Sequence, residues 1–270
     1  KLYSARRILL ALMMRSKRYG NMRLFNYQEI TSNSEQLQFA ALTIEYQPLQ
    51  YYVAFRGTDG WINSWKEDAN MTYMFPVPAQ QKAGLYLKGV LSGLRLGSFI
   101  VGGHSKGGNL AMYAAAENDD GRITKVYNND GPGFDRSYLE TPEYQRIRER
   151  IITILPENSM VGVLLNGENT RIVVSSDAPE LMDQHNGLSW KVDENGFIQL
   201  EKLSDVSLFI NETMNKWYER LDREHKEMFV NTIYQEVQNL EIRTAGDLTA
   251  KIGEVIYRVL KSRSEEHTSE

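Results

Sequence analysis

The chain has 270 residues, of which 41% are hydrophobic, so it is long enough to bury the core of one large domain. Its 31 basic and 35 acidic side chains leave a net charge of −4, a balance that gives no reason to expect a nucleic-acid partner. Cysteine is absent, which excludes disulfides and thiolate metal sites, and we expect a cytoplasmic location.

The first predicted element is an amphipathic helix that begins near Ser4 and ends near Met14. Its apolar run, residues 8–14, is too short to span a bilayer and is followed by basic side chains. It also lacks the small-residue cleavage site of a signal peptide. We therefore expect no transmembrane segment and interpret the run as an ordinary amphipathic helix.

From residue 37 onward, apolar runs of strand length alternate with segments of helical pattern. The predicted strands cover residues 37–46, 51–55, 97–103, 123–127, 151–155 and 171–175, the first two joined by a hairpin turn. The predicted helices cover residues 61–71, 78–91, 109–116 and 144–150. This alternation predicts an α/β fold with a mostly parallel sheet flanked by helices on both faces.

After Ser204 the pattern changes to helices alone. We expect a core over residues 1–203, C-terminal helices packed on it over 204–261, and a disordered polar tail over 262–270. Thr244 and Asp247 resemble a capping box that begins the last helix.

The segment Gly103-His104-Ser105-Lys106-Gly107 fits the pattern G-x-S-x-G, in which a serine occupies a tight turn from a strand to a helix. The pattern alone is weak evidence. An apolar strand before it and a small-residue helix after it strengthen the interpretation of Ser105 as a nucleophile.

A serine hydroxyl needs a base to remove its proton, and the chain contains four histidines. His104 adjoins the serine, so its side chain should point the other way, and His225 and His267 lie in polar stretches that look exposed. His185, in a loop after the last predicted parallel strand, is therefore the predicted base.

An acid should orient that histidine. Asp130 is the preferred candidate because it stands at the carboxyl end of the strand that follows the nucleophile helix, although a purely structural role in the Gly131-Pro132 turn is nearly as plausible. Glu157, after the next strand, is the alternative acid, and Asp177 is a weaker one.

The oxyanion of the reaction requires hydrogen-bond donors. We expect one from the backbone N–H of Lys106 and a second from Thr58, in the turn after the strand 51–55. Asp68 and Trp65 are expected to form hydrogen bonds beneath the Thr58 loop. The side chain of Lys106 is expected to be exposed at the start of its helix, rather than to hold an anionic substrate.

Several linked motifs resemble known families. Residues 54–58, Trp65 with Asp68, and residues 103–108 resemble the class-three lipases. Together with residues 38–43, 130–134, 159–162 and Gln184-His185, they resemble more closely the Mbeg-like bacterial family of lipase-like α/β-hydrolases, over residues 24–235.

The resemblance implies an α/β-hydrolase fold with Ser105 as nucleophile, His185 as base, and Thr58 and Lys106 as oxyanion donors. The position of the carboxylate that would orient His185 differs from that in the class-three lipases. Those lipases carry an aspartate after the strand that corresponds to residues 151–155, where this chain has Ser159. The segment from Asp130 to Phe134 instead resembles the loop that carries the acid in pancreatic-type lipases.

The sequence therefore predicts a serine esterase or lipase-like hydrolase that acts on a small acyl ester or a lipid. We expect neither a cofactor nor a metal. A transient contact with a membrane surface is possible through the apolar cluster at residues 71–75. The alternatives are a catalytically inactive lipid-binding or scaffolding protein on the same fold, and a protein-interaction role for the C-terminal helices.

Overall fold

The computed structural model describes residues 2–59, 62–167, 170–179, 181–242, 247, 251, 253–255 and 257–258. The predicted tail over 262–270 and the capping residue Thr244 lie outside this described part.

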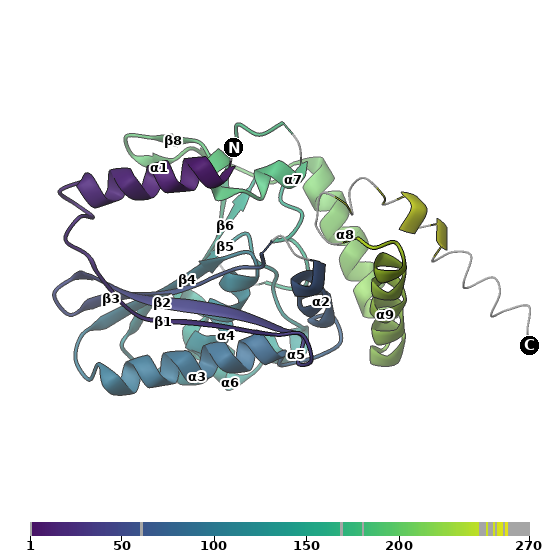
Figure 1. The fold of residues 1–270 in the computed structure, drawn as a ribbon, viewed down its shortest axis with the longest axis horizontal. Coiled ribbons are helices and arrows are strands. Elements are labelled where there is room, and N and C mark those ends of the chain that lie inside the picture. Colours follow the sequence, from purple (N-terminus) through teal and green to yellow (C-terminus); the bar gives the residue numbers. More distant parts are fainter. Residues whose placement is uncertain are drawn as a thin grey trace, which may run out of the picture.

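An eight-stranded sheet forms the centre of the molecule (Figure 1), and its strands follow one another in chain order from one edge to the other. They are β1 (Arg23–Ser32), β2 (Leu37–Gln47), β3 (Gln50–Phe55), β4 (Ser98–His104), β5 (Ile123–Asn129), β6 (Ile151–Pro156), β7 (Thr170–Val174) and β10 (Gln199–Leu200). The pairs from β3 to β7 are parallel, whereas β1, β2 and β10 pair antiparallel at the two edges. With helices in the crossovers, this is an α/β-hydrolase fold, as the sequence predicts.

Nine α-helices accompany the sheet in the described part of the chain. They are α1 (Leu2–Arg15), α2 (Ile62–Asn70), α3 (Pro78–Gly93), α4 (Lys106–Asn118), α5 (Arg136–Leu139), α6 (Pro142–Ile147), α7 (Leu181–Gln184), α8 (Asp205–Arg220) and α9 (Arg223–Asn239). Figure 1 shows α3, α4 and α6 on one face of the sheet, and α1 on the other face near the small hairpin of β8 (Val192–Asp193) and β9 (Gly196–Phe197).

The main core lies between the sheet and the layer of α3 and α4. Phe99 and Val101 on β4 are fully buried there, as is Leu87 on α3. Three consecutive alanines of α4, residues 114–116, are also fully buried. Small side chains let this helix approach the sheet closely, which fixes the position of its first residue next to the end of β4.

The sequence prediction missed β1. This edge strand is exposed along most of its length and is interrupted by a bulge between Phe25 and Gln28. Without one buried face, it lacks the alternation that reveals a strand.

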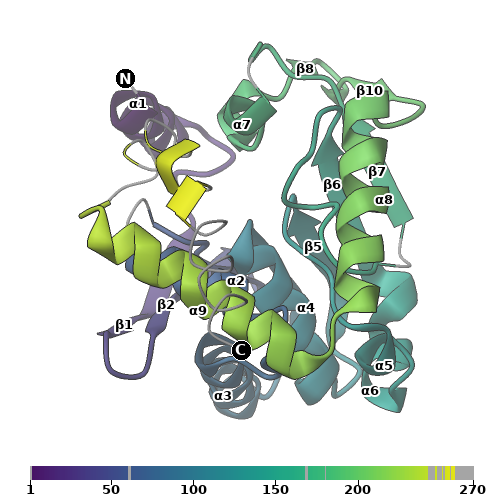
Figure 2. The same ribbon diagram turned by 90° about the vertical axis from the view of Figure 1, so that its right-hand side faces the viewer.

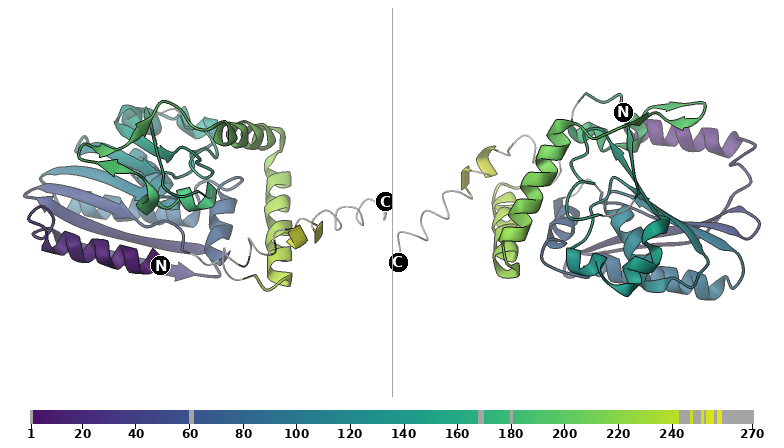
Figure 3. Two further views of the ribbon diagram at one scale, coloured as in Figure 1. Left: turned by 90° about the horizontal axis from the view of Figure 1, so that it is seen from above. Right: turned by 180° about the vertical axis from the view of Figure 1, so that it is seen from behind.

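The two C-terminal helices stand at one end of the sheet and run in different directions (Figures 2 and 3). Ile210 of α8 packs against the cluster of Leu155, Val163, Val173 and Leu203. Trp65 of α2 and Ile233 of α9 pack against a second cluster that contains Val237. Both helices therefore contact the segments that carry the predicted site, while the division of the chain at residue 203 stays a prediction.

Two leucines on α3 provide a matched test of this packing. Leu87→Ala removes a fully buried side chain and should lower the free energy of unfolding by about 2–5 kcal/mol. Leu85→Ala, on the same helix but 64% exposed, should change it by less than about 0.5 kcal/mol. Urea unfolding followed by circular dichroism measures both, and equal effects would contradict the assigned core.

Candidate active site

Ser105 occupies a sharp turn between β4 and α4. Its φ of 57° and ψ of −134° are unusual for a residue with a side chain. The flanking glycines allow this turn, since a Cβ on Gly103 would lie 2.3 Å from the carbonyl carbon of Gly107. A Cβ on Gly107 would in turn lie 2.3 Å from the carbonyl oxygen of Phe55. Strand, turn and helix therefore touch, and Ser105 lies where the free N–H groups of the first turn of α4 converge.

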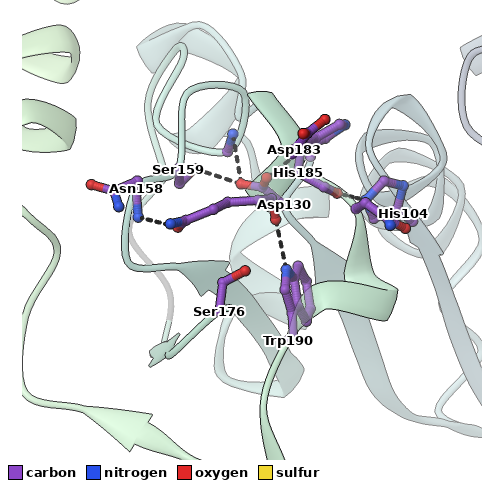
Figure 4. A network of polar contacts seen from close by, with 12 residues as sticks. His104, Asp130, Asn158, Ser159, Ser176, Asp183, His185 and Trp190 are labelled. Carbon is purple, nitrogen blue, oxygen red and sulfur yellow. Dashed lines mark hydrogen bonds and ion pairs between the residues drawn. The ribbon is translucent and has the colours of Figure 1, made fainter. Parts of the chain in front are cut away.

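His185 and Asp130 meet across this edge of the sheet (Figure 4). His185 directly follows α7, and Asp130 directly follows β5 with a positive φ of 52°. The distance from His185 Nδ1 to Asp130 Oδ2 is 2.6 Å, and Asp130 is fully buried. A carboxylate can only accept here, so Nδ1 carries the proton and the lone pair of a neutral ring remains on Nε2.

The second oxygen of Asp130 has two further donors. The hydroxyl of Ser159 donates to Oδ1 at 2.5 Å, and the backbone N–H of Gly162 donates to the same atom at 3.1 Å (Figure 4). Hydrogen bonds to a charged acceptor are stronger than neutral ones, so these donors stabilise the buried carboxylate and fix its orientation.

The loop of His185 is held by residues that the sequence analysis did not assign. His104 Nε2 donates to the backbone carbonyl of His185 at 2.6 Å, and the two rings lie 4.5 Å apart (Figure 4). Burial lowers the pKa of His104, and the nearby His185 lowers it further. The indole N–H of Trp190 donates to the carbonyl of Gln184 at 2.8 Å. The contact between His104 and His185 joins residues 81 apart in the chain, so no local sequence pattern predicts it.

The two other candidate acids lie elsewhere. Glu157 Oε1 accepts from the backbone N–H of Ser176 at 3.5 Å. Asp177 pairs with Lys191 at 3.3 Å, and its side chain is mostly exposed. Of the three carboxylates considered, Asp130 is the one that contacts His185.

The Thr58 loop is supported from below by α2. The hydroxyl of Thr58 donates to Asp68 Oδ2 at 2.5 Å, and Trp65 Nε1 donates to the carbonyl of Asp59 at 3.3 Å. The expected hydrogen bonds of Asp68 and Trp65 beneath this loop are confirmed. Burial raises the pKa of Asp68 to about 6, while the charge of Lys106 acts in the opposite direction.

The prediction of an exposed Lys106 side chain is wrong, because the residue is only 1% exposed. Its Nζ lies 2.9 Å from Glu67 Oε2 and donates to the carbonyl of Gln38 at 3.0 Å. Asp68 Oδ1 is 3.6 Å away. The side chain of Lys106 thus turns inward and joins the nucleophile turn to α2 and β2.

Glu67 is fully buried and has three donors. Besides Lys106, the backbone N–H groups of Gln38 and Ala79 donate to its carboxylate at 3.2 Å and 2.8 Å. A buried charge is tolerated when it is paired and fully hydrogen-bonded, as it is here.

Among the described residues, no hydrogen bond joins Ser105 Oγ to His185 Nε2. The ring of His185 lies 4.5 Å from that of His104, the neighbour of Ser105 in the chain. Catalytic hydrogen bonds are often long before a substrate binds. Within the same described ranges, no three histidine, aspartate or glutamate side chains gather as a metal site requires.

A cavity of about 230 Å³ has Asn109, in the first turn of α4, as part of its wall. Its apolar lining comes from Met71, Met74, Phe75, Phe134, Tyr138 and Leu165, and its polar rim includes Lys226. The cluster at residues 71–75 is thus part of a cavity wall, with Met71 buried and Phe75 exposed and in ring contact with Tyr138.

Removing the buried cation tests the role of the Lys106–Glu67 pair. Lys106→Met should lower the free energy of unfolding by about 3–5 kcal/mol, because it leaves the Glu67 carboxylate buried without a counter-ion. Adding Glu67→Gln to this variant should restore part of the loss. Lys88→Met, an exposed lysine on α3, is the control and should change stability by less than about 0.5 kcal/mol. Chemical denaturation measures all three, and a Lys106→Met variant as stable as the control would refute the argument.

Several solved structures that are similar to this chain are fungal lipases. The Rhizomucor miehei lipase in complex with its propeptide has a TM-score of 0.46 at 14% identity, covering 65% of this chain and 65% of that one. The chain thus spans slightly less than two thirds of that lipase. A fungal lipase bound to an inhibitor has a TM-score of 0.45 at 13% identity, covering 76% of this chain and 83% of that one.

A predicted CIB-like hydrolase from Thermoplasma acidophilum has a TM-score of 0.33 at 10% identity, covering 74% of this chain and all of that one. Among curated proteins, no match was found. The sequence profile of the Mbeg1-like family, by contrast, matches residues 13–235, most of the chain, including every residue of the candidate site. The chain belongs to the Mbeg1-like family.

Proposed function

We propose that this protein is a serine hydrolase that cleaves a carboxylic ester or a related acyl bond through an acyl-enzyme. The observation that supports this most strongly is the 2.6 Å contact between His185 and a buried Asp130 beside the Ser105 turn. A base oriented by a carboxylate, next to a serine on a tight turn, is the arrangement that activates a hydroxyl.

In the first step, Ser105 Oγ attacks the acyl carbon while its proton moves to His185 Nε2. The imidazolium that results is stabilised by Asp130, whose orientation Ser159 and Gly162 maintain. As the tetrahedral intermediate collapses, the bond to the alcohol breaks, and His185 returns its proton to the leaving oxygen. The acyl group is then bonded to Ser105.

The negative charge of the intermediate would be held by backbone donors. Lys106 is the first residue of α4, so its N–H has no partner within the helix. The hydroxyl hydrogen of Thr58 is engaged by Asp68, which leaves the backbone N–H as the donor that Thr58 offers to the substrate. We therefore assign Asp68 a positioning role, since it fixes the loop from which that donor projects.

In the second step, His185 takes a proton from water as the water oxygen attacks the acyl carbon. The bond to Ser105 Oγ then breaks, the acid leaves, and His185 returns the proton to Oγ. The cavity lined by Met71, Phe75 and Phe134 has the apolar, aromatic surface that suits an acyl chain. Ser105 and His185 are not among the residues that line this cavity, so its use as an acyl site is part of the proposal.

The alternative is an inactive lipid-binding protein on the same fold, favoured by the missing hydrogen bond between Ser105 and His185. A fluorophosphonate probe distinguishes the two, because it reacts with a serine hydroxyl that a base has activated. We expect the folded wild type to be labelled and Ser105→Ala to remain unlabelled. Ser92→Ala, an exposed serine on α3, is the control and should be labelled like the wild type. Folded wild type that resists the probe would favour the binding protein.

A second comparison identifies the acid. Asp130→Asn should reduce kcat/KM for a test ester by about 10⁴-fold, because the imidazole then takes the wrong tautomer. Glu157→Gln should leave the rate nearly unchanged, since Glu157 contacts the backbone of Ser176 instead. Urea unfolding of each variant establishes that it is folded. A larger loss for Glu157→Gln than for Asp130→Asn would transfer the role to Glu157.

A further inference from the structure

The N-terminal helix α1 exposes apolar side chains around most of its circumference. Five large ones, Ile8, Leu9, Leu10, Leu12 and Met14, are between 44% and 70% exposed. The hydrophobic clusters of the described residues contain no member of α1. Exposed single apolar residues are ordinary, but a contiguous run on one helix marks an interaction site.

These side chains do not form one stripe. At 3.6 residues per turn, Ile8 and Leu12 lie on one side of the helix, and Leu10 and Met14 lie roughly opposite. Packing against the sheet would cover one of these sides and leave the other in water. In the head-group region of a lipid layer, by contrast, Ile8 and Leu12 can reach the acyl chains while Leu10 and Met14 stay at the level of the head groups.

Positive charge is concentrated in the first 28 residues of the chain. Residues 1–28 contain seven lysines and arginines and no acidic residue. The rest of the chain carries the other 24 basic residues and all 35 acidic ones, a net charge of −11. Arg15 and Lys17, at the end of α1, are exposed. The positive charge of an acidic protein is thus concentrated beside its exposed apolar helix.

We infer that α1 lies in the plane of an anionic phospholipid surface, with its apolar side chains among the acyl chains and its cations at the head groups. Its 14 residues are about 21 Å long, less than the roughly 30 Å of a hydrocarbon core. In the described part of the chain, no helix is both long and apolar enough to cross a membrane. The helix therefore suits the interface rather than a span.

The position of α1 links this surface to the candidate site. The N-terminal end of the helix lies near α7, the helix that precedes His185 (Figure 1). Arg6 is close enough to His104 to contribute, after burial and His185, to the lowering of the pKa of His104. Docking through α1 would bring the Ser105 side of the sheet to the lipid. This consequence rests on the proposed function, whereas the docking itself does not.

Vesicle binding tests the inference without turnover. The Ser105→Ala variant should co-sediment with vesicles of phosphatidylcholine and phosphatidylserine and remain in solution with phosphatidylcholine alone. Binding should weaken as salt is added. Arg15→Gln with Lys17→Gln should weaken it by about 25-fold, since each cation near an anionic bilayer contributes about a factor of five. Lys88→Gln with Arg95→Gln, two exposed cations on the α3 side, should not weaken it.

A second pair of variants tests how much the apolar side chains of α1 contribute to vesicle binding. Ile8→Ser with Leu12→Ser should reduce binding by more than about tenfold, while Leu85→Ser with Leu96→Ser, equally exposed beside the other face of the sheet, should not. Unfolding curves identify any variant that is misfolded. The inference would be overturned if the wild type did not bind anionic vesicles. It would also be overturned if the wild type formed a dimer in solution and this dimer required Ile8 and Leu12. Fluorophosphonate labelling of Ser105 is scored separately, so either proposal can fail alone.

Discussion

A buried ion pair between Lys106 and Glu67 connects the parts of this molecule that would have to act together. Lys106 directly follows the candidate nucleophile, and Glu67 precedes Asp68, which holds the hydroxyl of Thr58. The same glutamate accepts hydrogen bonds from the start of β2 and the start of α3. Because a buried charge separated from its partner costs several kcal/mol, the pair keeps these segments in one arrangement. The turn of Ser105 and the loop of Thr58 therefore cannot move independently.

The C-terminal helices extend this support to both halves of the site. On α8, the hydroxyl of Ser207 donates to the carbonyl of Ser159, and Asn211 donates to the carbonyl of Val163 at 2.7 Å. These contacts hold the loop whose hydroxyl and N–H groups face Asp130. On α9, Asn231 accepts from Lys66 of α2 at 3.1 Å. One helix thus contacts the loop that faces Asp130, and the other contacts α2, which lies beneath the Thr58 loop.

The sequence predicts the sheet well because its inner strands are short apolar runs bounded by turns, and such runs carry their signal locally. The G-x-S-x-G turn is predicted for the same reason, since its glycines are adjacent to the serine. The side chain of Lys106 is predicted wrongly because its partners, Gln38 and Glu67, are 68 and 39 residues away in the chain. The sequence sets His104 aside because neighbouring side chains of a strand point in opposite directions, but this does not predict its hydrogen bond to the backbone carbonyl of His185.

The sequence alone did not decide which carboxylate contacts His185. Asp130 and Glu157 both follow parallel strands at the same edge of the sheet, so their positions in the chain left both as candidates. Three-dimensional contacts separate them, because the backbone carries Glu157 toward Ser176 and away from the imidazole. A strand end predicts that a side chain reaches the edge of a sheet, but not which neighbour it meets there.

The short hydrogen bond from Ser159 to Asp130 has a consequence for where such a site can hold a carboxylate. Residue 159 is the position where class-three lipases are expected to carry their aspartate, and here its side chain reaches the carboxylate that holds the base. Two ionised carboxyl groups at that separation would repel each other, and one of them would retain its proton. The two positions are therefore alternatives for a carboxylate: the serine at residue 159 supplies a hydrogen-bond donor to Asp130 where a second carboxylate would supply repulsion.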